Sequence, residues 1–213
     1  MPAYRGKRAL DLVLVGITSP VWLPALALTA AATRVMLGRP VVFRQQRPGL
    51  DGRLFELLKF RTMTNGRDAS GTLLPDAQRM TAYGRWLRAT SLDELPELLN
   101  VLRGEMSLVG PRPLLIDYLP LYSVEHSRRH DVRPGITGLA QVSGRNAIGW
   151  EEKLNLDVEY VDSASLALDL RIIWRTLAAV VRRTGISSPG EETAARFTGY
   201  GDITRQEPDE RTR

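Results

Sequence analysis

The chain has 213 residues, of which 43% are hydrophobic and 25% charged, values that exclude a disordered chain and a membrane protein with many spans. It contains no cysteine and only two histidines, which excludes disulfides, thiolate metal sites and a cysteine nucleophile and argues against a histidine-rich zinc centre. The formal net charge of +5 indicates an anionic partner, which could be a membrane surface, a phosphorylated substrate or nucleic acid.

The first notable segment is residues 12–33, which run for 22 positions without a charge. About 20 apolar residues are enough to cross a bilayer as a helix. Pro20 and Pro24 interrupt this segment, so a broken helix is expected. The hydroxyls of Thr18 and Ser19 can hydrogen-bond carbonyls that the prolines leave without a donor.

Basic residues flank the apolar segment on both sides, although a helix that crosses a membrane usually shows a bias of positive charge toward its cytoplasmic end. They are Arg5, Lys7 and Arg8 before it and Arg34, Arg39, Arg44 and Arg47 after it. We therefore expect residues 1–40 to form a re-entrant helical hairpin in the membrane, broken at Ser19 and Pro20. A kinked spanning anchor and a cleaved signal peptide are the alternatives.

The next part of the chain predicts a small hairpin and a loop. Residues 41–60 contain two apolar-rich stretches around Pro48-Gly49 and Asp51-Gly52, a pattern typical of a β-hairpin. Residues 64–75 are rich in Gly, Asn, Ser and Asp and predict a surface loop that could move over a site.

Helices and glycine-rich turns are predicted further along. Residues 77–88 and 92–102 predict two helices, the second with Ser91 as N-cap and Gly104 as its stop. The run RPGITGLAQVSGRN contains glycines at 135, 138 and 144, which permit close approach of the backbone to a neighbour.

The last predicted helix covers residues 165–183 and carries apolar residues at helical spacing with arginines between them. It could lie on a membrane surface or pack against the core of the domain. Residues 187–213 have little to bury and predict a flexible C-terminal tail. The expected fold is α+β and predominantly helical, with residues 41–186 as the catalytic domain.

The chemistry is expected at the adjacent acids Asp93 and Glu94. Ser91 and Glu94 also fit a capping box, which is the purely structural alternative. Several arginines share this part of the chain, namely Arg85, Arg88, Arg103, Arg112 and Arg133. Guanidinium groups grip phosphate oxygens, neighbouring carboxylates can hold Mg²⁺ against the same oxygens, and an aspartate can act as a nucleophile. Together these residues favour phosphoryl transfer.

Three longer segments of the sequence point to a known protein family. VVFRQQRPGLDGRLFELLKFRTM, LRATSLDELPELLNVLRGEMSLVGPRPLL and RPGITGLAQVSGRN resemble those of the bacterial sugar transferases, the monotopic phosphoglycosyl transferases. The match runs from about residue 7 to residue 174 and corresponds to the minimal catalytic form. It implies a membrane helix broken at a Ser-Pro pair, a catalytic helix and amphipathic helices at the membrane interface, and an active site facing the cytoplasm.

The resemblance also implies an activity. Members of this family transfer a sugar phosphate from a nucleotide diphosphate sugar, usually UDP-linked, to a polyprenol phosphate, here expected to be undecaprenyl phosphate, and release UMP. The expected partners are these two substrates and inner-membrane lipid in the bacterial cytoplasmic membrane, and the expected cofactor is Mg²⁺. The product would start membrane-linked glycan assembly.

Carried onto this sequence, the resemblance makes Asp93 the nucleophile that receives the phosphosugar. Glu94 would help to hold Mg²⁺ together with Asp93, or would orient and deprotonate the acceptor. The candidates for phosphate and substrate contacts are Arg88, Arg112, Arg145, Lys59 and Arg61. Arg112 could instead cap a helix end, and Arg145 could be a surface charge. Glu97 stands where the family more often has glutamine, which could alter the local charge.

Two other classes of function are weighed against an enzyme. A membrane-anchored scaffold with a basic surface would tolerate loss of Asp93 but not loss of several arginines. Nucleic-acid binding is not expected, because aromatic residues make up only 7% of the chain and the basic residues are spread along it. The sequence leaves open the sugar, the glycan pathway and the oligomeric state, a homodimer being one option.

Overall fold

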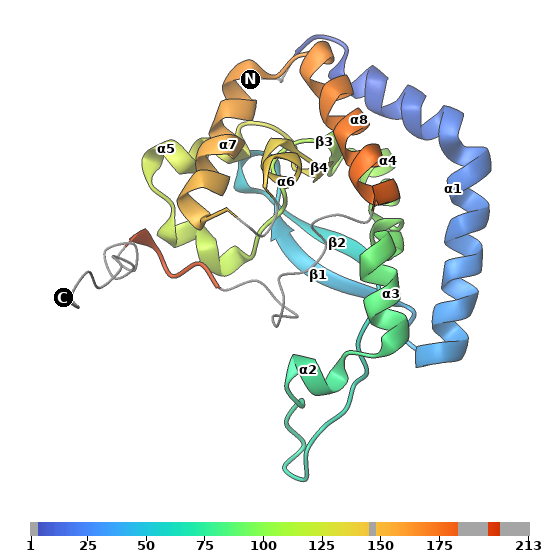
Figure 1. Ribbon diagram of the computed structural model, residues 1–213. Coiled ribbons are helices and arrows are strands. Elements are labelled where there is room, and N and C mark those ends of the chain that lie inside the picture. Colours follow the sequence, from blue (N-terminus) through green and yellow to red (C-terminus); the bar gives the residue numbers. More distant parts are fainter. Residues whose placement is uncertain (1–3, 145–147, 183–195, 201–213) are drawn as a thin grey trace, which may run out of the picture.

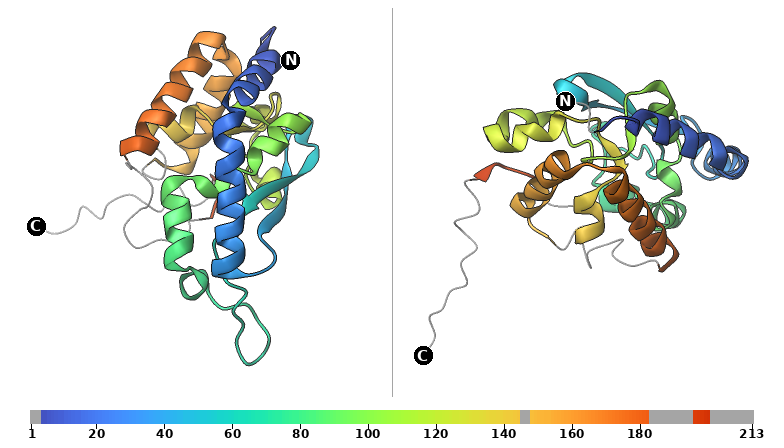
Figure 2. Two further views of the ribbon diagram at one scale, coloured as in Figure 1. Left: turned by 90° about the vertical axis from the view of Figure 1, so that its right-hand side faces the viewer. Right: turned by 90° about the horizontal axis from the view of Figure 1, so that it is seen from above.

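The computed structural model describes residues 4–144, 148–182 and 196–200. The protein is predominantly helical with two small sheets, so the expected α+β class is confirmed. The long helix α1 (Lys7–Leu37) runs along one side of the molecule (Figure 1). Figure 2 (left) shows α1 crossing that side with α3 (green) and the β-hairpin (cyan) on either side of it.

Helix α1 is continuous and bends about midway along its length (Figure 1). Three side chains near the bend, Thr18, Ser19 and Trp22, donate hydrogen bonds to carbonyls of the preceding turns. The distances are 2.6 Å from Thr18 to Leu14, 2.7 Å from Ser19 to Gly16 and 2.9 Å from the Trp22 indole to Val15. Pro20 has no N–H for the Gly16 carbonyl, which accepts the Ser19 hydroxyl instead, so the predicted use of a hydroxyl beside the proline is confirmed for Ser19. The Thr18 hydroxyl binds the Leu14 and Val15 carbonyls, which no proline deprives of a donor.

One stripe of α1 packs against the domain and the rest is exposed. The buried positions lie at helical spacing: Asp11, Val15, Trp22, Thr29 and Thr33. The exposed apolar residues are Leu12, Val13, Ile17, Val21, Leu23, Leu28, Val35 and Met36. By length and composition α1 could cross a membrane, its apolar window having a mean hydropathy of 1.8. A re-entrant path stays a prediction.

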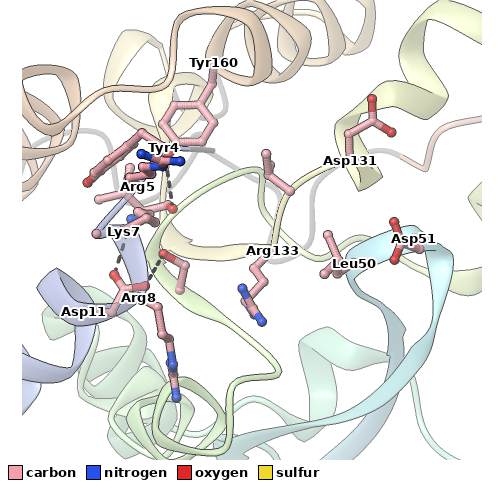
Figure 3. A pocket seen from close by; sticks show the side chains of 14 residues that line it. Tyr4, Arg5, Lys7, Arg8, Asp11, Leu50, Asp51, Asp131, Arg133 and Tyr160 are labelled. Carbon is pink, nitrogen blue, oxygen red and sulfur yellow. Dashed lines mark hydrogen bonds and ion pairs between the residues drawn. The ribbon is translucent and has the colours of Figure 1, made fainter. Parts of the chain in front are cut away.

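The first turns of α1 are joined to the domain by a polar network, of which Figure 3 shows the side chains of Tyr4, Lys7, Asp11 and Tyr160. The Lys7 ammonium lies 2.7 Å from the Asp169 carboxylate, which also accepts the hydroxyls of Tyr4 (2.7 Å) and Tyr160 (2.8 Å). Asp11 accepts the Ser107 hydroxyl at 2.8 Å. Asp11 and Asp169 are almost fully buried, so these bonds determine the direction in which α1 leaves the domain.

The predicted hairpin is confirmed. Strand β1 (Val42–Pro48) pairs antiparallel with β2 (Leu54–Phe60), with the 3₁₀ turn η1 (Leu50–Gly52) between them. Phe55 and Leu57 of β2 join Val15 and Trp22 of α1 and Val101 in one hydrophobic cluster. This cluster fixes the hairpin against α1.

The region from residue 64 to residue 90 differs in part from expectation. Residues 64–75 form no helix or named strand, as the predicted loop requires. The single helix predicted over 77–88 is wrong, because the chain forms α2 (Asp76–Arg79) and then α3 (Ala82–Thr90). Thr81 separates them: its hydroxyl accepts the Gly84 N–H at 2.9 Å and caps the second helix.

The helix predicted over 92–102 is also divided. Ser91 adopts a left-handed conformation, φ 55°, and makes no side-chain cap, so the predicted N-cap is wrong. Leu92–Glu94 forms the 3₁₀ turn η2, and α4 (Glu97–Arg103) begins after Pro96, whose missing N–H suits a first turn. The predicted stop is confirmed, because Gly104 has φ 83° and its N–H binds the Val101 carbonyl at 3.0 Å.

The remaining elements form the other half of the domain. They are β3 (Ser107–Val109), η3 (Ile116–Leu121), α5 (Val124–Ser127), η4 (Arg128–His130), β4 (Gly135–Thr137), α6 (Leu139–Ser143), α7 (Trp150–Ser163) and α8 (Leu166–Arg182). β3 and β4 pair in parallel. Helix α8 confirms the predicted last helix. Residues 196–200, within the tail expected to be flexible, pack against the domain.

The buried Asn100 joins α4 to β2 and was not identified from the sequence. Its amide nitrogen donates to the Glu56 carbonyl at 2.7 Å, and its amide oxygen accepts the Leu58 N–H at 3.1 Å. Both backbone groups flank Leu57 on β2, so Asn100 sets the height at which the next residue, Lys59, faces α4.

Replacing Asn100 with alanine is expected to lower the free energy of unfolding by about 2 to 5 kcal/mol, because two buried backbone groups lose their partner. Urea unfolding of the detergent-solubilised protein measures this loss. Asn65→Ala, in the exposed loop, is the matched control and should change the value by less than about 0.5 kcal/mol. Equal stability of the two variants would contradict the anchoring role of Asn100.

Candidate active site

Three carboxylates gather where α3, η2 and α4 meet, and we call Asp93, Glu94 and Glu97 the carboxylate cluster. Asp93 and Glu94 belong to the 3₁₀ turn η2, and Glu97 is the first residue of α4. Asp93 is 8% exposed and Glu97 is 1% exposed. Such burial is costly for carboxylates unless cations compensate their charge.

Two cations compensate it unequally. The Lys59 ammonium lies 2.9 Å from Glu94 Oε1 and 3.0 Å from Glu97 Oε1. The Arg112 guanidinium lies 2.6 Å from the same Glu94 Oε1. No hydrogen bond or ion pair to Asp93 is formed by the part of the chain that the structure describes. Glu94 is therefore neutralised from two sides, while the oxygens of the Asp93 carboxylate are not bound by any described side chain.

Because their surroundings differ in this way, Asp93 and Glu94 have different pKa values. Burial, and then the charge of Glu94, raise the pKa of Asp93 to about 6. Burial would also raise the pKa of Glu94, but Arg112 and Lys59 outweigh it and hold that pKa well below its usual range. Asp93 is thus the more basic carboxylate and is still mostly ionised at neutral pH, a combination suited to nucleophilic attack.

Glu97 is a third carboxylate of the cluster and pairs with Lys59, as Glu94 does. Burial raises the pKa of Glu97 to about 7, although Lys59 acts in the opposite direction. Near neutral pH the carboxylate cluster therefore changes its net charge at Glu97 while Glu94 stays ionised.

Arg112 is presented by a turn that a glycine contact holds in place. The turn follows β3, and a Cβ on Gly110 would lie 2.4 Å from the Arg133 carbonyl oxygen. A Cβ on Gly135 would lie 2.1 Å from the Gly110 nitrogen, so only glycines allow this approach. The side chain of Arg112 pairs with Glu94 and is 42% exposed, so it faces both the acids and the solvent.

The other predicted contact residues fall into three groups. Arg88 on α3 donates to the Thr62 hydroxyl at 3.2 Å, and its charge lowers the pKa of Asp93, so it lies beside the cluster. Arg61 does not reach the cluster, because its guanidinium binds the Leu37 and Arg39 carbonyls at the end of α1. Arg145 lies outside the described residues.

Arg47 on β1 is a site residue that the sequence did not single out for a role. Burial and the charge of Arg112 lower the pKa of Arg47, and Glu97 also acts on it. The influence of Arg112 and Glu97 on this pKa indicates that Arg47 lies near the carboxylate cluster, where its positive charge favours an anion. The signal was present as the second arginine of the strand sequence RQQR.

The carboxylate cluster offers oxygen donors of the kind that bind Mg²⁺. No group of three or more Asp, Glu, His or Cys residues suited to a metal occurs among the described residues. Mg²⁺ commonly takes one or two carboxylates and completes its shell with substrate phosphates and water. The free oxygens of Asp93 and the second oxygen of Glu94 are such donors, so these two residues fit a metal that arrives with a phosphorylated substrate.

The sequence of this chain is similar to those of known bacterial proteins. Residues 3–183 match the profile of a family described as bacterial sugar transferase. The chain is 57% identical over 176 residues to an uncharacterized sugar transferase, EpsL, of Bacillus subtilis, covering 83% of this chain and 87% of that protein.

Two further relatives carry more specific names. One is the UDP-glucose:undecaprenyl-phosphate glucose-1-phosphate transferase of Caulobacter vibrioides, 42% identical over 82% of this chain and 69% of the relative. The other is the undecaprenyl-phosphate galactose phosphotransferase of Salmonella typhimurium, 41% identical over 70% of this chain and 35% of the relative.

The raised pKa of Asp93 predicts an effect on stability with a definite sign. Above pH 6 the native state holds a buried charge that the unfolded chain solvates, so Asp93→Asn should raise the unfolding free energy by about 1 to 3 kcal/mol at pH 8. Below about pH 3 the carboxyl is protonated in both states and the gain should vanish. Unfolding of the wild type and the variant in metal-free buffer at pH 8 and at about pH 3 measures this difference in unfolding free energy.

The exposed Asp131→Asn provides the control and should change the stability little at either pH. Destabilisation by Asp93→Asn at pH 8 would mean that the native carboxylate has a stabilising partner.

Proposed function

The chain belongs to the bacterial sugar transferase family, and on this premise we propose that it transfers a sugar 1-phosphate from a UDP-sugar to undecaprenyl phosphate through an intermediate on Asp93. The names of the Caulobacter and Salmonella relatives support the two substrate classes. The observation that carries the proposal is that Asp93 has no ion-pair partner among the described residues, while two cations neutralise the neighbouring Glu94. The product would start assembly of a membrane-linked glycan.

The reaction proceeds in two displacements at one phosphorus. An ionised oxygen of Asp93 attacks the phosphorus that carries the sugar, and the bond to UMP breaks with its electron pair leaving on UMP. The phosphosugar is then held on Asp93 as an acyl phosphate. An oxygen of the lipid phosphate attacks the same phosphorus, the bond to Asp93 breaks, and the free carboxylate returns.

The cations around the carboxylate cluster would stabilise the negative charge on the phosphate oxygens in these two steps. Arg112, which is paired with Glu94 and partly exposed, and Arg47 and Arg88, whose charges act on the cluster, would bind the diphosphate of the donor. Lys59 and Arg112 keep Glu94 ionised, so its second oxygen can hold Mg²⁺ together with Asp93. When bound, Mg²⁺ would offset the repulsion between the phosphates and the acids.

The exposed apolar surfaces support a place at the membrane for this reaction. Besides α1, helix α8 exposes Leu166, Leu170, Trp174 and Leu177, and α3 exposes Trp86. Such surfaces are stabilised in lipid rather than in water. With α1 as a re-entrant anchor whose two basic ends stay on the cytoplasmic side, a water-soluble donor and a lipid acceptor can meet at one site.

We expect Asp93→Asn to abolish UMP release from UDP-sugars in the presence of undecaprenyl phosphate and Mg²⁺, because the amide is not a nucleophile. In the wild type, kcat/KM should fall below about pH 6 as Asp93 becomes protonated. UMP release from a panel of UDP-sugars in lipid nanodiscs measures both. Turnover by Asp93→Asn at the rate of the Asp131→Asn control would contradict the proposal.

The re-entrant anchor is tested by labelling, since the chain contains no native cysteine. Arg5→Cys and Arg39→Cys place single thiols on either side of the apolar segment. In intact cells, a membrane-impermeant maleimide is expected to reach neither thiol, and in inverted vesicles both. Labelling of one of the two thiols in intact cells would show a spanning anchor instead.

A further inference from the structure

A short piece of the C-terminal tail packs into the domain although it lies beyond the family match. The match ends at residue 183, and the described segment Arg196–Tyr200 follows it. We call Arg196–Tyr200 the strap. Phe197 and Tyr200 are the only aromatic residues after residue 187. Phe197 is nevertheless only 4% exposed, so a polar tail contributes a core residue. Figure 1 shows the strap (red) below α5.

The ring of Phe197 inserts into an aromatic pocket. It contacts Tyr118 edge-on at 5.7 Å between ring centroids, Trp150 at 5.5 Å and Tyr122 in a stacked arrangement at 6.0 Å. Its backbone N–H donates to the Tyr118 hydroxyl at 3.2 Å. Ring packing and a backbone hydrogen bond together specify one position for Phe197.

Tyr200 supplies a second, polar attachment. Its ring stacks on His126 at 5.6 Å, and its hydroxyl oxygen accepts the Ser123 N–H at 3.1 Å. The same hydroxyl hydrogen-bonds His126 Nδ1, while Nε2 of that ring lies 2.8 Å from the Asn155 amide oxygen. Gly199 has φ 98°, a conformation that lets residues 197 and 200 turn toward the same pocket.

A continuous set of contacts leads from this pocket to the candidate active site. The guanidinium of Arg129 lies over the ring of Tyr122, 5.5 Å from its centroid, on the way from Phe197 to the site. Arg129 forms a buried ion pair with Asp157 at 2.7 Å. The same guanidinium donates to the backbone carbonyl of Arg112 at 2.7 Å. Arg129 thus connects the aromatic pocket to the turn that presents Arg112 to Glu94.

We infer that the strap docks in cis on the pocket formed by Tyr118, Tyr122, His126 and Trp150 and acts as a positioning element for the Arg112 turn. The ring of Phe197 stacks on Tyr122 and limits the motion of that ring. The Tyr122 ring in turn packs against the Arg129 guanidinium, which donates a hydrogen bond to the Arg112 carbonyl. Because the strap is covalently attached, a weak contact is enough to keep the pocket filled. Its effect on donor binding rests on the proposed function, whereas the docking does not.

Hydrogen exchange tests the docking and the positioning without any activity measurement. Three proteins in lipid nanodiscs are compared: the full chain, a chain ended after Tyr200, and a chain ended after Ala195. We expect the first two to exchange alike. The chain ended after Ala195 should exchange about ten-fold faster in peptides covering residues 123–130 and residues 112–122.

Point variants in the full chain separate the two attachments. Phe197→Ala should speed exchange in both peptides, because it removes the ring that confines Tyr122. Tyr200→Phe should affect mainly residues 123–130, because it removes only the hydroxyl, which binds Ser123 and His126. Unchanged exchange in the chain ended after Ala195 would overturn the docking. Faster exchange that leaves residues 112–122 unaffected would overturn the positioning role.

Kinetics then measures the consequence for the donor. In the chain ended after Ala195 we expect the KM for the UDP-sugar to rise about ten-fold, with the KM for undecaprenyl phosphate unchanged and kcat within about three-fold. General damage to the fold would instead lower kcat and affect both substrates. An unchanged donor KM would overturn the positioning role. Absence of transfer by the full chain would refute the proposed function, and hydrogen exchange would still decide the docking.

Discussion

The convergence of Lys59 and Arg112 on one oxygen of Glu94 is the interaction on which the rest of the site depends. It keeps a buried acid ionised and leaves its neighbour Asp93 as the more basic carboxylate. Each cation comes from a different part of the fold. Lys59 is set in place by the bonds of Asn100 to β2, and Arg112 by the glycine contact between β3 and β4.

The polar network at the start of α1 connects this helix to the part of the domain that holds the carboxylate cluster. Lys7 and Asp11 connect that helix to Asp169 and Ser107, whose carboxylate and hydroxyl are buried in the domain. Arg8 donates to the Val101 and Leu102 carbonyls at the end of α4, the helix that begins with Glu97. The depth of α1 in a bilayer would therefore set the height of the carboxylate cluster above it. This coupling suits a reaction between a soluble donor and a lipid acceptor.

Local signals in the sequence predicted the hairpin, helix α8, the stop at Gly104 and the hydroxyl bonds near Pro20, because each depends on residues close in the chain. The break at Thr81 and the left-handed Ser91 were mispredicted, since helical periodicity continues across both positions. Asp93, Glu94, Lys59, Arg88 and Arg112 are brought together as expected. Arg61 is drawn instead to carbonyls at the end of α1, and the packing of Phe197 depends on partners about 75 residues away.

We propose that Asp93, rather than Glu94, carries the phosphosugar. To test this assignment, the protein is mixed with its UDP-sugar and Mg²⁺ in the absence of lipid phosphate and quenched within milliseconds to seconds, and the intact mass and the modified peptide are measured. We expect a phosphosugar adduct on Asp93 in the wild type and in Glu94→Gln, and none in Asp93→Asn. An adduct on Glu94, or UMP formed with no adduct at any quench time, would contradict it.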